Sequence, residues 1–62
     1  MDFTLTMNLD NAAMHHEDDD SPDVYALGDR LRYLADRVEQ GELAGDVMDV
    51  NGNRIGTFTF ME

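Results

Sequence analysis

The sequence predicts an α+β domain in which one helix packs on a three-stranded antiparallel or mixed sheet, in the order β-α-β-β. Three observations predict this fold: an alternating N-terminal segment, a central segment with helical periodicity, and two apolar C-terminal segments joined by Asn51-Gly52. Sixty-two residues are enough for a single small domain, residues 1–62.

Residues 1–9 form the first predicted strand. Apolar and polar side chains alternate there, with one face made of Phe3, Leu5, Met7 and Leu9. This period of two is typical of a half-buried strand. Residues 10–20 have no periodicity and are acidic, so we expect a long loop.

A helix is predicted over residues 22–40. Ser21 is suited to the N-cap, Pro22 to the first helical position, and Gly41 to the position after the last turn. Apolar residues recur between them at helical spacing, and we expect this stripe to face the sheet: Val24, Leu27, Leu31, Leu34 and Val38.

Residues 45–61 form a predicted hairpin. Asn51-Gly52 favours a two-residue type I′ turn, while a three-residue loop would shift the pairing of the strands. A right-handed crossover through the helix makes the first two strands parallel, and the third strand ("RIGTFTFM") then lies between them.

The charge balance restricts the partners. Fourteen Asp and Glu residues face four Arg residues, which gives a net charge of −10. Such a chain repels nucleic acid and anionic membranes and is attracted to basic protein surfaces. No apolar run is long enough to span a membrane, and the absence of cysteine suits the reducing cytoplasm.

Metal-binding and catalytic interpretations are weaker. "HHEDDDSPD" (residues 15–23) offers imidazoles and carboxylates, but adjacent ligands in one loop seldom enclose an ion. "DVNGNR" begins like a calcium loop, yet Arg54 and Phe60 occupy the positions of its glycine and its bidentate glutamate. No nucleophile–base arrangement is visible, so we predict no enzyme, no cofactor and no metal; a metal-binding module is the third alternative.

A partner-binding surface is the favoured interpretation. The helix face opposite the apolar stripe carries Asp29, Tyr33, Asp36, Arg37 and Gln40, with Tyr25 beside it, and the acidic loop leads into it. The carboxylates recur at roughly 6–10 Å, close to the phosphate step of a DNA strand. A solvated helix face is the plain alternative. The residues predicted to contact the partner are Glu17, Asp18, Asp19, Asp20, Asp23, Tyr25, Asp29, Tyr33 and Asp36.

The pattern "LxxLADRVEQGELxGxVxDVNGNRIGxF", residues 31–58, is similar to one that recurs in small acidic proteins of bacteriophages and mobile elements. The chain resembles the small anti-CRISPR proteins, specifically the type I-C group. This resemblance implies an inhibitor in the cytoplasm of a bacterial host that blocks target DNA binding by a type I effector complex (Cascade). The runner-up is a structural or regulatory mobile-element protein that forms a homodimer through its open sheet face; a monomer is favoured.

Overall fold

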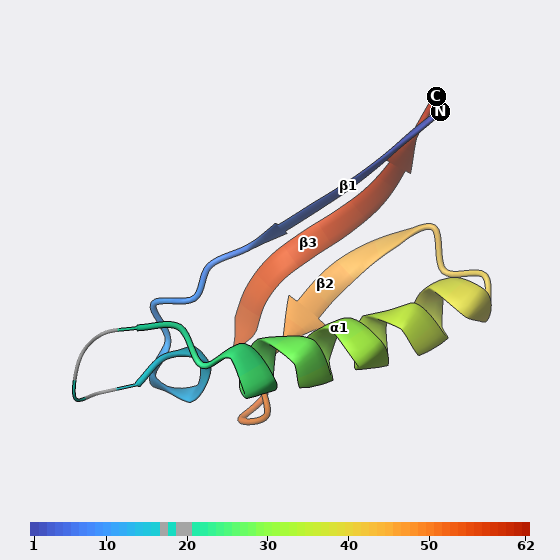
Figure 1. Cartoon of the computed structure of the whole chain (residues 1–62). Coiled ribbons are helices and arrows are strands. Elements are labelled where there is room, and N and C mark those ends of the chain that lie inside the picture. The colour runs from blue at the N-terminus through green and yellow to red at the C-terminus, as the bar shows by residue number, and fades with distance from the viewer. Residues whose placement is uncertain (17, 19–20) are drawn as a thin grey trace.

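The computed structural model describes residues 1–16, 18 and 21–62. The elements are β1 (Asp2–Met7), the 3₁₀-helix η1 (Ala12–Met14), α1 (Val24–Glu39), β2 (Ala44–Met48) and β3 (Arg54–Met61). One helix packs against a three-stranded sheet, which confirms the predicted α+β class (Figure 1).

The strand order is β1-β3-β2, with β3 antiparallel to both neighbours. The edge strands β1 and β2 are therefore parallel to each other, as predicted. Facing residues share one side of a sheet, so the register defines cross-strand rows. On the helix side one row is Leu5, Phe58 and Gly45, and the next is Met7, Gly56 and Val47.

The start of the helix differs from the prediction. The helix begins at Val24, and its N-cap is Asp23 rather than Ser21: the Asp23 carboxylate accepts hydrogen bonds from the backbone N–H groups of Tyr25 and Ala26. Pro22 forms an antiparallel bridge with His15, which keeps the backbone extended at this point. The other end agrees with the prediction, because Gly41 has the positive φ of 98° that ends a helix.

The segment after β1 contains structure that the sequence did not predict. Asn11 caps η1 by accepting a hydrogen bond from the Ala13 N–H at 3.0 Å. This short helix places Met14 in the core, where only 1% of its surface is exposed. The prediction of a structureless loop over residues 10–20 is therefore wrong for its first half.

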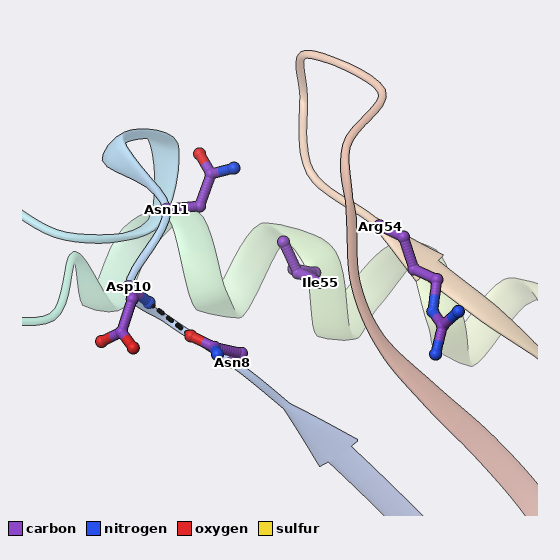
Figure 2. Close-up of a pocket in the computed structure, with 5 residues that line it drawn as sticks. All are labelled: Asn8, Asp10, Asn11, Arg54 and Ile55. Atoms are coloured by element: carbon purple, nitrogen blue, oxygen red, sulfur yellow. Dashed lines mark hydrogen bonds between the residues drawn. The ribbon is translucent and has the colours of Figure 1, made fainter.

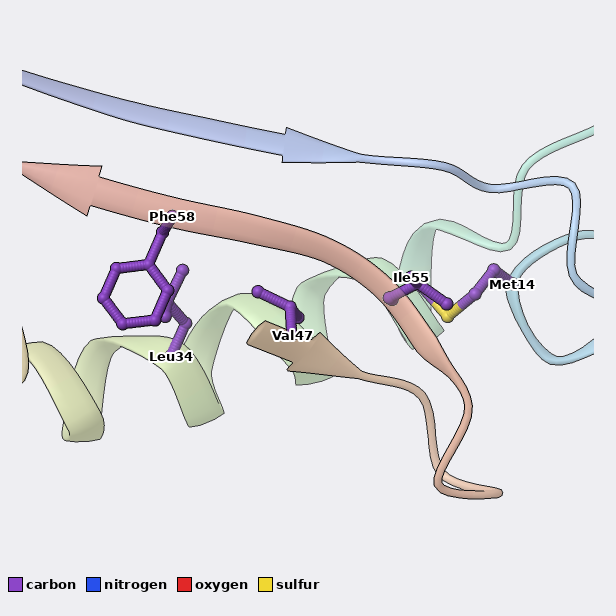
Figure 3. Close-up of a cluster of buried hydrophobic side chains, with 5 residues drawn as sticks. All are labelled: Met14, Leu34, Val47, Ile55 and Phe58. Carbon is purple, nitrogen blue, oxygen red and sulfur yellow. The ribbon is translucent and has the colours of Figure 1, made fainter. Parts of the chain in front are cut away.

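The core lies between the sheet, α1 and η1. Its buried side chains are Met14, Leu34, Val47, Ile55 and Phe58 (Figure 3). Leu27 and Val38 of the predicted helix stripe pack against this cluster. Val24 and Leu31 do not belong to the core as predicted, because they are 63% and 41% exposed. The helix is thus rolled about its axis from the predicted orientation.

The hairpin uses the longer of the two turns considered. The Asp49 N–H donates to the Asn53 carbonyl at 2.8 Å, and the Gly52 N–H donates to the Asp49 carbonyl at 3.1 Å. The loop is therefore Val50–Asn51–Gly52, with Gly52 at a φ of 82°. The register shifts beside Val47, as expected where a β-bulge adds a residue.

Candidate partner-binding surface

The outward face of α1 carries the predicted side chains. Asp29 and Asp36 are exposed, and Tyr25 and Tyr33 are 85% and 49% exposed. Asp23 is half-buried at the N-cap, where its carboxylate is already used by the first backbone N–H groups of the helix. The exposed face therefore presents two tyrosines among carboxylates, with Asp23 at its edge.

The sequence predicted Arg37 on this face, but its side chain does not lie there. Its guanidinium turns toward β2, where Nη1 donates to the Asp46 carbonyl at 2.6 Å and Nη2 pairs with the Glu42 carboxylate at 3.0 Å. It also stacks over Phe58, 5.2 Å from the ring centroid. The hydrogen bond that Arg37 donates to the Glu42 carboxylate raises the pKa of Arg37. The stem of Arg37 covers the core while its charge reaches the sheet edge.

Arg30 makes a parallel set of contacts two helical turns earlier. Its Nη1 lies 3.4 Å from the Met48 carbonyl, and its Nη2 pairs with Asp29 at 2.8 Å. The guanidinium carbon is 5.0 Å from the Tyr33 ring centroid. The seven-residue spacing of Arg30 and Arg37 is the sequence signal that both lie on one flank.

Charge on the helix is consequently segregated. Arg30 and Arg37 neutralise the flank that contacts β2, while Asp36 and Glu39 remain exposed on the outward side. Arg32 is the arginine that stays exposed along the helix. A partner approaching the outward face thus meets the exposed carboxylates of Asp36 and Glu39 together with Asp29, which is paired with Arg30.

The described residues on either side of the acidic stretch pair with each other near the start of α1. The His16 N–H donates to the Ser21 carbonyl at 2.8 Å, next to the bridge between His15 and Pro22. Nδ1 of His15 lies 2.8 Å from the Asn11 carbonyl oxygen and 3.1 Å from that of Leu9. Carbonyl oxygens only accept hydrogen bonds, so this nitrogen carries a proton.

The predicted acidic residues of this loop divide into two groups. Asp18 is exposed. Glu17, Asp19 and Asp20 lie outside the residues that the structure describes.

The "DVNGNR" segment forms the turn rather than a calcium loop. Asp49 is only 3% exposed, and its carboxylate accepts from the backbone N–H groups of Asn51 and Asn53, each at 2.9 Å. These hydrogen bonds, foremost that from Asn53, lower the pKa of Asp49. In residues 1–16, 18 and 21–62, no three His, Asp or Glu side chains gather as metal ligands.

A shallow hollow of about 340 Å³ lies between the end of β1 and the start of β3. Its lining residues are Asn8, Asp10, Asn11, Arg54 and Ile55 (Figure 2). The Asn8 side chain accepts from the Asp10 N–H at 2.8 Å, and the Asn11 side chain caps η1. Both amides therefore shape the chain around the hollow.

The sheet face opposite α1 is polar. Thr4 pairs with Thr59, and Thr6 pairs with Thr57, which places four hydroxyls on this face. Asp46 pairs with Thr57 on the other side and continues the polar surface. Ala44 and Met61 belong to the same face, and Met61 is 54% exposed, so this face also carries some apolar area. The homodimer through this face stays a prediction.

Comparisons of the chain with protein-family models, curated proteins and solved structures returned no match. Among the described residues, no helix has both the length and the apolar composition that a membrane span requires.

Proposed function

We propose that this protein is a DNA-mimicking inhibitor of a type I CRISPR effector complex, like the small acidic anti-CRISPR proteins. It acts in the cytoplasm of the host bacterium, occupies a basic DNA-binding surface and prevents target DNA from binding. It uses no catalytic step and no cofactor, and it does not contact nucleic acid itself. The central binding residues are Tyr25, Asp29, Tyr33 and Asp36, extended by the acidic residues Glu17, Asp18, Asp19, Asp20 and Asp23.

The observation that supports this proposal is the segregation of charge on α1. A chain with a net charge of −10 is attracted to any basic surface, but a specific inhibitor needs one defined face. Arg30 and Arg37 turn toward β2, which leaves Asp29, Tyr33 and Asp36 on the outward side. Spaced carboxylates on a rigid helix are suited to replace phosphates along a strand.

The tyrosines supply the contacts that charge alone does not provide. Exposed carboxylates speed association but contribute little affinity each, whereas tyrosine is enriched among residues that dominate binding energy. Arg30 lies 5.0 Å from the Tyr33 ring centroid and Arg37 lies 5.8 Å from it. These cation–π contacts hold the Tyr33 ring in place before the partner arrives.

Reversing two charges on the outward face tests the proposal. Asp29→Lys combined with Asp36→Lys is expected to weaken binding to a purified type I-C effector complex by about tenfold or more. Two attractive contacts, each worth roughly 0.2–1 kcal/mol, become repulsive ones. Surface-immobilised effector complex gives the affinity, and an electrophoretic shift of target DNA gives the inhibition.

A matched control changes the net charge equally on the opposite side of the molecule. This control is Asp2→Lys combined with Asp46→Lys, both on the polar sheet face. Each double variant removes one aspartate that pairs with an arginine: Asp29, at 2.8 Å from Arg30, in the test variant, and Asp46, at 3.6 Å from Arg54, in the control. Equal loss of binding in the two variants would show that only net charge matters. The helix face would then not be the binding surface.

The order of addition tests the mechanism. Inhibitor that is bound first should prevent the effector complex from shifting target DNA, and DNA that is bound first should prevent inhibition. A ternary complex of effector, DNA and inhibitor with unaltered DNA affinity would contradict DNA mimicry.

A further inference from the structure

The two edges of the sheet differ in whether their outward backbone groups are occupied. β1 and β2 are the edge strands, because β3 lies between them. In an antiparallel pair, every second residue directs its N–H and C=O toward the partner strand, and the residues between direct theirs away from it. Each edge strand therefore has a set of backbone groups that point away from the sheet.

The β2 edge is closed by side chains of α1. The Asp46 carbonyl accepts a hydrogen bond from Nη1 of Arg37 at 2.6 Å, and the Met48 carbonyl lies 3.4 Å from Nη1 of Arg30. Charged donors of this kind satisfy the outward carbonyls of an edge strand. A further strand at this edge would have to displace both arginines.

The β1 edge is open. The Asn8 N–H donates to the Ile55 carbonyl at 2.7 Å, so the even-numbered residues of β1 direct their backbone groups toward β3. Phe3, Leu5 and Met7 consequently direct theirs outward. In the described part of the chain, β3 is the one strand that pairs with β1, and α1 packs along β2 and η1 instead (Figure 1). We call the outward backbone groups of Phe3, Leu5 and Met7 the open edge.

The segment that forms the open edge lacks the features that usually prevent strand addition. Natural edge strands are protected by lysines, prolines, bulges or a covering element. Residues 2–7 ("DFTLTM") contain no basic residue and no proline, and their register with β3 is regular from Asp2 to Met7. Asp2 is the one charged residue of the segment and lies at its end. In a chain with a net charge of −10, this segment therefore offers little local repulsion to another strand.

The residue pattern of β1 favours a second copy of the chain as the added strand. From Phe3 to Met7, apolar residues alternate with threonine in the same order in both chain directions. An antiparallel pairing of two copies about a twofold axis at Leu5 places Phe3 opposite Met7 of the other copy, and Thr4 opposite its Thr6. Thr–Thr pairs and contacts between methionine and an aromatic ring are favourable.

This register uses every group of the open edge. Leu5 pairs with itself across the axis and Phe3 pairs with Met7 on either side, which gives about six backbone hydrogen bonds. Sliding one copy by two residues brings Phe3 opposite Leu9, whose carbonyl oxygen already lies 3.1 Å from Nδ1 of His15. Sliding it the other way leaves Met7 opposite a position before β1 begins. Pairing about Leu5 is therefore the most complete register.

The same register keeps negative charges apart. Asp2 of one copy lies opposite Asn8 of the other, so the two Asp2 carboxylates are about 20 Å apart along the paired strands. α1 contacts β2, the strand farthest from the open edge, and the two β2 strands of the pair are about 24 Å apart across the joined sheet. Both separations exceed the screening length of about 8 Å at physiological ionic strength.

We propose that two copies of this protein pair through the open edge, antiparallel about Leu5, and form one continuous sheet. The β2 edges at both ends of this sheet are closed by Arg30 and Arg37, so assembly stops at a dimer. The proposal does not depend on the inhibitor function, because the outward face of α1 takes no part in it. It is also distinct from a homodimer through the polar sheet face.

Amide hydrogen exchange of the full chain, followed by NMR, tests which edge is used. The N–H groups of Phe3, Leu5 and Met7 should exchange rapidly in dilute protein and become at least about tenfold slower as protein concentration rises. The Asp46 N–H points outward from β2 and is the internal control, whose exchange should not depend on concentration. If exchange at Phe3, Leu5 and Met7 were independent of concentration, as it would be in a dimer through the polar sheet face, the proposal would be overturned.

Two double variants test the register. Thr4→Lys with Thr6→Glu, the opposite-charge variant, places unlike charges opposite each other on both sides of the axis. Thr4→Lys with Thr6→Lys, the like-charge variant, places like charges there. Both threonines are exposed, so circular dichroism should show the native fold for both variants.

Sedimentation equilibrium measures the outcome. The wild-type mass should rise from 7.0 kDa toward twice this value with protein concentration, and the like-charge variant should dimerise at least about tenfold more weakly than the opposite-charge variant. Net charge alone predicts the reverse order, because the like-charge variant carries less negative charge. A wild-type mass of 7.0 kDa at every concentration, a mass above that of a dimer, or association of the like-charge variant that equals or exceeds that of the opposite-charge variant would each overturn the proposal.

Discussion

Asp49 is a buried carboxylate in a chain whose other acids are mostly exposed. Its side chain accepts two backbone hydrogen bonds within the hairpin turn and lies 3.4 Å from the Asn53 side-chain nitrogen. Hydrogen bonds to the charged form of a carboxylate favour that form, which is why the pKa of Asp49 is lowered from 3.8. The residue therefore links the stability of the hairpin to pH.

Asp49 should make the fold sensitive to acid. A carboxylate whose pKa is lower in the folded state contributes stability above its unfolded pKa, and this contribution is lost as pH falls through the folded pKa. We expect Asp49→Asn to lower the melting temperature at pH 7. The difference in melting temperature between Asp49→Asn and the wild type should shrink as pH falls below about 4.

Asp36→Asn is the control for this prediction, because Asp36 is exposed on α1 and should change the melting temperature less. If the melting temperature of Asp49→Asn stayed below that of the wild type by the same amount from pH 7 to strong acid, the shape of the side chain and not its charge would explain the loss of stability.

At the scale of elements, two arginines fix the orientation of α1. Arg30 and Arg37 reach the carbonyls of Met48 and Asp46, two alternate residues of the edge strand β2. Carbonyls on the free edge of a strand have no partner strand, so a charged donor is favourable there. These contacts hold the flank that carries Arg30 and Arg37 against β2, and Leu31 lies outside the core, 41% exposed.

This orientation predicts different effects for two leucines on the same helix. Leu34 is 5% exposed, so Leu34→Ala should cost about 2–5 kcal/mol, a large part of the stability of a small domain. Leu31 is 41% exposed, so Leu31→Ala should cost about 1 kcal/mol or less. Urea denaturation measures both. Equal costs would indicate that the helix faces the sheet through the stripe predicted from periodicity.

At the scale of the whole molecule, excess negative charge opposes the compact state. Fourteen acidic residues and four arginines leave a net charge of −10, and the ion pairs of Arg30, Arg37 and Arg54 offset only part of the repulsion. Dissolved salt weakens the repulsion among the many carboxylates more than it weakens the attraction within these ion pairs. Stability should therefore rise with ionic strength.

We expect the melting temperature to increase when NaCl is raised from low to physiological concentration. A melting temperature that falls with added salt would mean that the ion pairs outweigh the net repulsion.

Local patterns determined the helix and the three strands of this protein, but not η1 or the residue at which the helix begins. The alternation from Phe3 to Met7 specifies a strand with one apolar face, and Gly41 ends the helix because it tolerates a positive φ. The exposure of Tyr25, Asp29, Tyr33 and Asp36 also follows from helical spacing, because polar residues on one side of a helix face water. These features depend on contacts between residues that are close in sequence.

Only the tertiary structure decided which side chains are buried and which are left exposed. Met14 lies in a segment without periodicity, and it enters the core because η1 brings it beside α1 and Ile55. Arg37 leaves the outward face because a carbonyl 9 residues away in sequence accepts its hydrogen bond. Phe3 is 46% exposed although it belongs to the apolar face of β1. Each of these outcomes depends on how far one element reaches over another, and the periodicity of a single element carries no information about that distance.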